Sequence, residues 1–261
     1  MKITALTENT SACGLPAEHG LSLFVETETV RFLFDAGQTG LFVQNARALG
    51  IDLDTAAFAV LSHGHYDHGG GLAAFMEINA HAPVYMSRHA FGPHYNAADK
   101  YIGLDPRLKD SGRVVFAEEG MRIAEGITLY GMHDAPMIVP ADACGLKMRL
   151  EDGRMAEDDF RHEQYLLVEE HGKRTLFSGC SHRGIRNIMR WFRPDTLIGG
   201  FHLSTWPVLP ADGALAAVAE ALDAYPAIYY TCHCTGTEQY RFMKARMKNL
   251  HYLSAGESVT V

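Results

Sequence analysis

Hydrophobic and polar positions along the chain fall into short runs that predict β-strands, followed by stretches of helical spacing. Residues 21–26 and 30–34 are rich in β-branched and aromatic side chains, and the short polar link between them indicates a hairpin. Residues 40–49 then place apolar side chains on one face of a helix. Residues 56–61 are continuously apolar, which is typical of a strand buried on both faces.

The rest of the chain continues this pattern. Strands are predicted at residues 84–87, 113–117, 121–123, 127–130, 164–169, 174–178, 196–199 and 227–231, and helices at 72–78, 185–191, 213–224 and 238–247. This order predicts one α/β domain over residues 1–261, with two sheets packed face to face and helices outside. In residues 89–108, Gly and Pro interrupt both the helical and the strand periodicity of apolar side chains. This indicates a lid-like insertion, with a decorative surface loop as the alternative.

Composition narrows the class of protein. The 261 residues are 47% hydrophobic, enough to fill a sizeable core, and the net charge of -8 argues against a nucleic-acid or anionic-membrane surface. No apolar run approaches the roughly 20 residues of a membrane span, and residues 1–8 turn polar too soon for a signal peptide. Five cysteines, an odd number, indicate reduced thiols, so we expect a cytoplasmic protein.

The unusual feature is the clustering of histidine, of which the chain has 14. His63, His65, Asp67 and His68 follow the buried strand at residues 56–61. Side chains two apart on an extended segment point the same way, so His63 and His65 can hold one metal ion together. Asp67 and His68, carried round the turn, can hold a second ion. A solvated histidine-rich turn is the alternative, which four candidate ligands directly after a buried strand disfavour.

The segment from Ser62 to Gly70 resembles the histidine motif of the metallo-β-lactamase superfamily. The resemblance implies a four-layer αββα sandwich of two mixed sheets flanked by helices. It also implies two divalent ions, zinc in the first place and iron or manganese as alternatives. Asp35 matches an early Asp that supports the histidine loop without binding metal. His at position 65 resembles the zinc hydrolase branch more than the di-iron branch.

Later segments supply the remaining ligands that the resemblance implies. Cys180 stands where the superfamily carries a metal-bridging Asp, and a thiolate favours zinc; a buried structural thiol is the alternative. His182 would complete the first ion's site, with His133 as a lower-ranked competitor. His233 would complete the second site. His202, at another strand end, is a candidate ligand, substrate contact or proton shuttle.

Cys232 and Cys234 alternate with His233. Along an extended strand they would face away from it, so we expect packed thiols and not ligands.

Several segments resemble one branch of the superfamily, the metallo-hydrolases similar to 7,8-dihydropterin-6-methyl-4-(β-D-ribofuranosyl)aminobenzene 5′-phosphate synthase. The matching segments are residues 17–22, 62–72, 162–164, 178–185, 199–203 and 233–236. One departure is His162, where the branch usually has an acidic residue.

The resemblance implies a zinc-dependent hydrolase in which metal-activated water attacks a small, phosphorylated or pterin-like substrate. Asp67, Glu163 and His202 are the candidate catalytic residues, and His19 is a candidate support near the ions. Candidates for binding a substrate phosphate or carboxylate are Arg88, Lys100, Tyr101 and Arg183, each equally compatible with a solvated surface role.

Three alternatives stay open at this point: a dihydropterin-phosphate transferase at the same centre, a non-catalytic ligand-binding or sensor protein, and, more weakly, a nuclease. The acidic net charge and the lack of a nucleic-acid-binding arm disfavour the nuclease. We therefore expect a small-molecule substrate, no nucleic-acid or membrane partner, and a chain that is compatible with a homo-oligomer.

Overall fold

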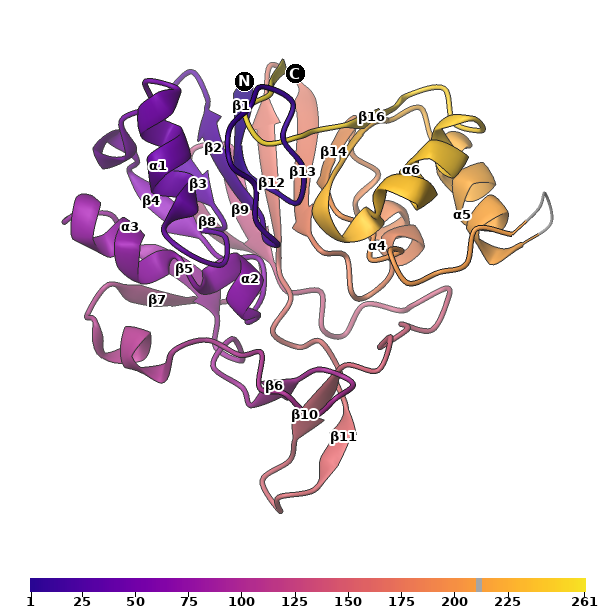
Figure 1. Ribbon diagram of the computed structural model, residues 1–261, viewed down its shortest axis with the longest axis horizontal. Helices are drawn as coiled ribbons and strands as arrows, with labels where there is room; N and C mark the ends of the chain where they lie inside the picture. Colours follow the sequence, from indigo (N-terminus) through magenta and orange to yellow (C-terminus); the bar gives the residue numbers. More distant parts are fainter. Residues whose placement is uncertain (210–212) are drawn as a thin grey trace.

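The computed structural model describes residues 1–209 and 213–261, and two seven-stranded sheets packed face to face dominate it (Figure 1). The first sheet has the order β17-β1-β2-β3-β4-β5-β7 and contains β1 (Lys2–Thr7), β2 (Ser22–Glu26), β3 (Arg31–Phe34), β4 (Phe58–Val60), β5 (Val84–Ser87), β7 (Val114–Ala117) and β17 (Ser258–Thr260). The second has the order β16-β15-β14-β13-β12-β9-β8 and contains β8 (Met121–Ala124), β9 (Ile127–Tyr130), β12 (Tyr165–Glu170), β13 (Lys173–Gly179), β14 (Thr196–Gly199), β15 (Ile228–Thr231) and β16 (Leu250–Tyr252).

Alternation of side chains along the strands explains the layers. On β3, Phe32 and Phe34 belong to the apolar cluster between the two sheets, whereas Leu33 belongs to the cluster under the outer helices. On β13, Phe177 lies between the sheets and Leu176 lies in the second outer cluster. The ring centroid of Phe177 is 5.3 Å from that of Phe34, so side chains of the two sheets interdigitate.

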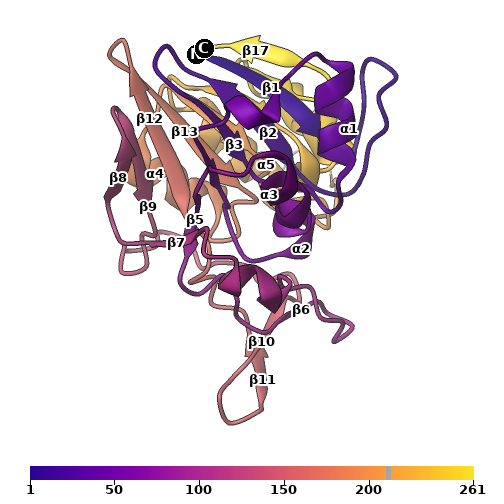
Figure 2. The same cartoon turned by 90° about the vertical axis from the view of Figure 1, so that its left-hand side faces the viewer.

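Helices cover the outer face of each sheet (Figure 1, Figure 2). On the first sheet these are α1 (Leu41–Ala48) and α3 (Leu72–Ile78), and on the second they are α4 (Ile185–Phe192), α5 (Ala214–Asp223) and α6 (Thr237–Lys244). The predicted αββα architecture is confirmed. No helix in the described part of the chain is both long and apolar enough to cross a membrane.

A third, small sheet projects from the sandwich (Figure 2). It is formed by β6 (His94–Tyr95), β10 (Lys147–Arg149) and β11 (Met155–Glu157). β6 lies within residues 89–108, the segment predicted as an insertion, and the short 3-10 helix η2 (Pro106–Asp110) begins at its end. The backbone N–H of Tyr66 donates to the carbonyl of Ile102 at 2.8 Å, so this segment is attached to the histidine loop.

Candidate metal centre

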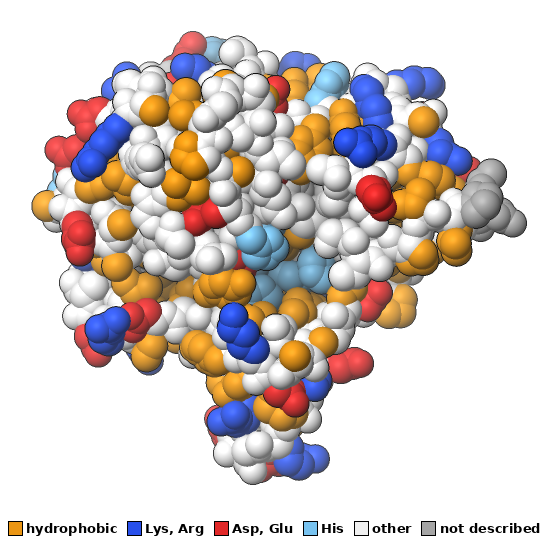
Figure 3. Space-filling view, in the orientation of Figure 1, with side chains coloured by type: hydrophobic (Ala, Val, Ile, Leu, Met, Phe, Trp, Pro, Cys, Tyr) orange, Lys and Arg blue, Asp and Glu red, His pale blue; other side chains and the backbone are white. Residues whose placement is uncertain are grey.

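The histidine-rich loops meet where strands of both sheets end. His63 follows β4, Cys180 follows β13 and His233 follows β15. β3 and β4 run parallel, as do β13, β14 and β15, so the loops at their carboxyl ends share one edge of each sheet, where open α/β sheets bind ligands. Figure 3 shows histidine side chains gathered in a hollow between the two halves of the molecule.

His63, His65 and His182 form a buried group whose ligand atoms all lie within 4.8 Å of one another. The Nε2 atoms of His63 and His182 are 3.2 Å apart. Two nitrogens bound to one tetrahedral ion at about 2.0–2.1 Å would stand about 3.3 Å apart, so this spacing fits a shared ion. Burial, reinforced by neighbouring histidines, lowers the pKa of all three rings well below the usual value. The neutral ring is the form that binds metal.

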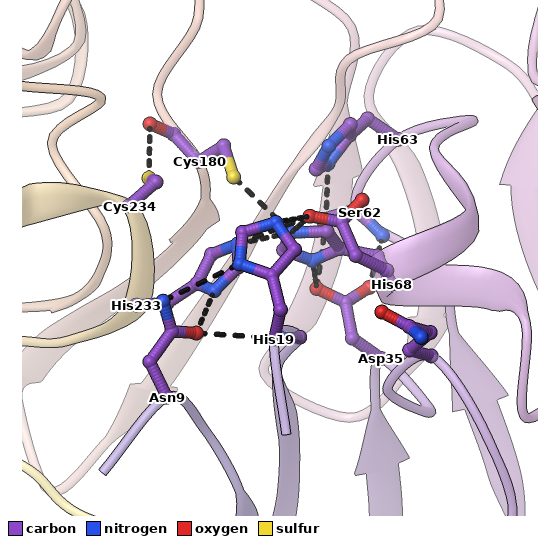
Figure 4. A network of polar contacts seen from close by, with 12 residues as sticks. Asn9, His19, Asp35, Ser62, His63, His68, Cys180, His233 and Cys234 are labelled. Atoms are coloured by element: carbon purple, nitrogen blue, oxygen red, sulfur yellow. Dashed lines mark hydrogen bonds and ion pairs between the residues drawn. The ribbon is translucent and has the colours of Figure 1, made fainter. Parts of the chain in front are cut away.

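A second group lies beside the first and contains His68, Cys180 and His233 (Figure 4). Asp67 joins this group through His233. Nε2 of His68 is 3.2 Å from Nε2 of His233 and 3.1 Å from Sγ of Cys180. Nε2 of His233 is in turn 3.3 Å from Oδ2 of Asp67. Nitrogen, sulfur and oxygen donors therefore converge at the spacing of a coordination sphere, and this mixed donor set suits zinc.

Asp35 supports both groups from behind (Figure 4). Its Oδ2 lies 2.7 Å from Nδ1 of His68 and accepts the hydroxyl of Ser62 at 2.7 Å, while Oδ1 accepts the Ser62 backbone N–H at 2.7 Å. The Ser62 hydroxyl also lies 2.8 Å from Nδ1 of His63. One buried carboxylate thus orients a histidine of each group, the position that the sequence resemblance implies for Asp35.

Comparison with known families decides the class of protein. The model of the metallo-beta-lactamase superfamily matches residues 15–145. The chain belongs to this superfamily.

Relatives and solved structures agree with the assignment to the metallo-beta-lactamase superfamily. A 7,8-dihydropterin-6-methyl-4-(beta-D-ribofuranosyl)-aminobenzene-5'-phosphate synthase from Methanocaldococcus jannaschii is 29% identical over 289 residues, which cover 99% of this chain and 96% of that protein. The crystal structure of Tm1679, described as a metal-dependent hydrolase of the beta-lactamase superfamily, matches with a TM-score of 0.81 and 28% identity, over 100% of this chain and 99% of that one. Zn(2+)-bound PqqB from Methylobacterium extorquens shares the fold, with a TM-score of 0.60 at 15% identity over 100% of both chains. The protein therefore has the fold of the metal-dependent hydrolases of this superfamily.

Glu163, which the sequence places among the candidate catalytic residues, lies behind the first group and is fully buried. Its carboxylate accepts the backbone N–H of His182 at 2.7 Å, that of Arg183 at 3.0 Å and the hydroxyl of Tyr165 at 2.6 Å. Both oxygens are therefore occupied by the loop that carries His182. Of the two roles open to Glu163, positioning and proton transfer, these contacts favour positioning of the loop that carries His182.

The alternation argument for Cys234 is wrong. Residues 233–235 form the 3-10 turn η3 (His233–Thr235) and not a continuing strand, so the strict alternation of side chains is lost. Cys234 accordingly joins Cys180 and His233 in one group of ligand atoms within 4.8 Å, and its thiol donates to the Cys180 carbonyl at 3.4 Å. Cys232 is packed in the core between the sheets, as expected.

His133 lies apart from the two ligand groups. It is exposed, with its ring 5.8 Å from that of His89, whereas the rings of His182 and His63 are 4.7 Å apart. Arg183 is also engaged elsewhere, because its guanidinium donates to the backbone carbonyls of residues 131–133. Neither side chain is placed to meet a ligand at the metal centre.

An apolar cavity of ≈ 270 Å³ opens beside the first group. Its apolar lining includes Val139, Ile185, Phe201, Leu203, Trp206 and Val218. His182 and His202 line it as well, with ring centroids 4.3 Å apart. Arg186 also lines the cavity, and its Nε is buried without a hydrogen-bond partner among the described residues.

Sequence analysis missed two residues that follow β1. Oδ1 of Asn9 lies 2.7 Å from Nδ1 of His233, and the carboxylate of Glu8 accepts the His233 backbone N–H at 3.0 Å. His19, a predicted support, lies with Nε2 3.2 Å from Oδ2 of Asp67. Glu8 and Asn9 could hardly be recognised from the sequence as supports of the site, because His233 is more than 200 positions away.

Proposed function

We propose that this protein is a zinc-dependent hydrolase with two ions, acting on a small anionic substrate. The first ion would be held by His63, His65 and His182, and the second by Asp67, His68, Cys180 and His233. The observation that supports the proposal is the convergence of donor atoms in both groups at separations of 3.1–3.3 Å, with His182 of the first group lining a cavity.

When bound, such ions act as Lewis acids and lower the pKa of a water to about 7. The chain's own residues orient the ligands and handle protons. Burial is the main cause that lowers the pKa of His202 to about 4, so its ring is neutral at pH 7 and can accept a proton or hydrogen bond from a group in the cavity. Asp67 offers Oδ2 to His19 and His233, and we assign it to the second ion.

The cavity supports a substrate with an apolar or aromatic body and an anionic group. Its lining is mostly apolar, which favours burial of a ring system or alkyl portion. Arg186 supplies a guanidinium whose buried Nε has no partner within residues 1–209 and 213–261, and a guanidinium binds phosphate or carboxylate well. Arg186 replaces Arg183 as our candidate for the anionic group.

Metal analysis combined with turnover tests the proposal. The purified chain should hold two zinc ions, and it should hydrolyse a chromogenic phosphodiester such as bis(p-nitrophenyl) phosphate. Asp67→Ala and His68→Ala should each lose one ion and at least about a hundredfold in kcat/KM, because each removes a ligand of the second ion. His81→Ala is the matched control: its ring is exposed and 3.7 Å from Asp54. Unchanged turnover in the two ligand variants would refute the two-ion mechanism.

A transferase at the same centre is the second candidate, because the synthase from Methanocaldococcus jannaschii matches 99% of this chain. Both candidates would use the same ligands and cavity. Turnover in water enriched in oxygen-18 separates them: a hydrolase places the label in its product, whereas a transferase passes the group to another acceptor without label. Two bound ions with no turnover on phosphodiesters, phosphomonoesters or carboxylic esters would favour the ligand-binding or sensor alternative.

A further inference from the structure

Asp158 begins a turn formed by residues 158–162, which lies beside the first ligand group. Its Oδ2 accepts Nδ1–H of His94, which lies on β6, at 2.7 Å. Its Oδ1 accepts the backbone N–H of Phe160 at 2.8 Å and lies 3.3 Å from Nε2 of His162. All four side chains are buried. The hydrogen bonds to Asp158 come from His94 and Phe160, whereas Nε2 of His162 faces its charge at 3.3 Å outside hydrogen-bond geometry. His94 and His162 hold the pKa of Asp158 below the usual value against the effect of burial.

One arm of the turn reaches the backbone between two ligands. Nδ1 of His162 accepts the backbone N–H of Gly64 at 2.9 Å, and Gly64 stands between His63 and His65. A side chain at position 64 would collide with the carbonyl of Ala90 on the neighbouring segment, so the backbone is held closely from both sides. The contact from His162 therefore fixes the segment that presents both histidines.

The other arm reaches the third ligand of the same group. The ring of Phe160 stacks on the ring of His182, with centroids 4.7 Å apart and planes 7° from parallel. The backbone of Phe160 has a φ of 53°, and its N–H is donated to Asp158. Asp158 thus contacts two residues that support the first group: His162, which holds the backbone between His63 and His65, and Phe160, which stacks on His182.

The hydrogen bond from Gly64 decides which nitrogen of His162 carries the proton. A nitrogen that accepts an N–H has no hydrogen of its own, so the proton of the neutral ring must be on Nε2, which faces Asp158. The opposite tautomer would turn a lone pair toward the carboxylate and an N–H toward the N–H of Gly64, and both contacts would be repulsive. The negative charge of Asp158 selects the tautomer that can hold Gly64.

We propose that Asp158 is a positioning residue of the first metal site, acting through the tautomer of His162 on Gly64 and through Phe160 on His182. His94 completes the unit by holding Asp158 from the inserted segment. The inference rests on the proposed function, because the residues that it positions are ligands of the first ion. It also explains how the chain accommodates His162 at a position where the resembling branch usually has an acidic residue: the carboxylate of Asp158 lies 3.3 Å from the His162 ring.

Two substitutions of His162 test the tautomer directly. The amide oxygen of Asn can occupy the place of Nδ1 and accept from Gly64, whereas Gln extends toward the place of Nε2. Zinc affinity is measured by competition with a chromophoric chelator in full-length protein carrying His233→Ala, which leaves one complete ligand group. His162→Asn should bind zinc within about threefold of its parent, and His162→Gln should bind about ten- to a hundredfold more weakly, the usual cost of losing an outer support.

Substitution of Asp158 tests the origin of the tautomer. Asp158→Asn should weaken zinc binding about ten- to a hundredfold, because its amide no longer dictates the position of the His162 proton. Asp159→Asn is the matched control, since Asp159 is the exposed neighbour and pairs with Arg161 at 3.3 Å. In the His162→Asn background, Asp158→Asn should cost less, because the asparagine has no tautomer to select.

Nitrogen-15 NMR of zinc-loaded wild-type protein gives a readout that needs no variant to fold. We expect His162 to carry its proton on Nε2, with a bare Nδ1. A proton on Nδ1, equal zinc affinities for His162→Asn and His162→Gln, or equal affinities for Asp158→Asn and Asp159→Asn would each overturn the inference while leaving the proposed function intact. A third zinc ion that the His162 variants lose would also overturn it, because His162 would then be a ligand. A wild-type chain that binds no zinc would refute the proposed function itself.

Discussion

Oδ2 of Asp35 lies 2.7 Å from Nδ1 of His68, and both side chains are completely buried. This contact leaves Nε2 of His68 directed at Cys180 and His233. A carboxylate behind a ligating histidine fixes the orientation of the ring and raises its basicity. Through His68, Asp35 at the end of β3 therefore supports the second ligand group.

Asp35→Asn should therefore weaken binding of the second zinc ion about ten- to a hundredfold. The neutral amide keeps the shape of the side chain but loses the charge that polarises His68. Chelator competition measures the affinity, and Asp54→Asn is the matched control because Asp54 faces His81 on the exposed surface at 3.7 Å. Equal affinities in the two variants would show that Asp35 has only a packing role.

Cys180 offers a second prediction, because it supplies the sulfur of the second group. Cys180→Ala should lose the second ion, with affinity falling on the order of a hundredfold, whereas Cys180→Asp should retain two ions and shift preference from zinc toward manganese. Metal analysis after growth with each metal measures the occupancy. Cys232→Ala, at a buried thiol of the core, is the control and should keep both ions. Two zinc ions in Cys180→Ala would remove Cys180 from the ligand set.

The two ion sites should respond differently to pH. Burial opposes the charge of His68, but Asp35 and Asp67 outweigh it and raise the pKa of His68 to about 9, and burial raises the pKa of the Cys180 thiol well above its usual range. Both groups must lose a proton to bind metal at pH 7, whereas the first group's rings, whose pKa is lowered, are already neutral.

Affinity for the second ion should therefore fall as the pH drops from 9 to 6, by about tenfold per pH unit for each proton released, while affinity for the first stays nearly constant. Dialysis at pH 6 and pH 8.5, followed by metal analysis, should give about one and two ions per chain. Loss of both ions together at pH 6 would contradict this order.

Arg186 is the fourth test. Arg186 lines the apolar cavity, and its buried Nε has no hydrogen-bond partner in the described part of the chain. Arg190, one helical turn further along α4, is exposed. Arg186→Gln should raise KM for an anionic substrate about ten- to a hundredfold, because a hydrogen bond to a charged group is worth about 1.5–3 kcal/mol, with a smaller effect on kcat. Steady-state kinetics with bis(p-nitrophenyl) phosphate provide the measurement. If Arg190→Gln has the same effect, the anionic group binds elsewhere.

The layers of the fold could be predicted from the sequence because both faces of the central strands are buried. β4 lies between a helix layer and the opposite sheet, with Phe58 and Val60 facing one layer and Ala59 the other, so its run is continuously apolar and easily recognised. β1 was not predicted as a strand because its threonines interrupt the apolar run, although they are buried as well. β16 and β17 have three residues each and are defined by their partners, β15 and β1, and not by a pattern of their own.

The candidate site could be predicted where its residues are consecutive. His63 to His68 lie within one turn, so their spacing carries the information. The roles of Asp158 and Glu163 could not be predicted, because they depend on contacts with Gly64 and His182 that only the folded chain creates. Cys234 was misplaced because an extended strand was assumed where a 3-10 turn begins.

Neither ligand group is complete within one half of the chain. His63 and His65 need His182, and Asp67 and His68 need Cys180 and His233. During synthesis the amino-terminal half therefore leaves the ribosome with half-formed sites, and tight uptake of the proposed zinc ions would await the last strands of the second sheet. Each proposed ion would link one sheet to the other, so removal of zinc should loosen the contact between the two halves before either half loses its own helices and strands.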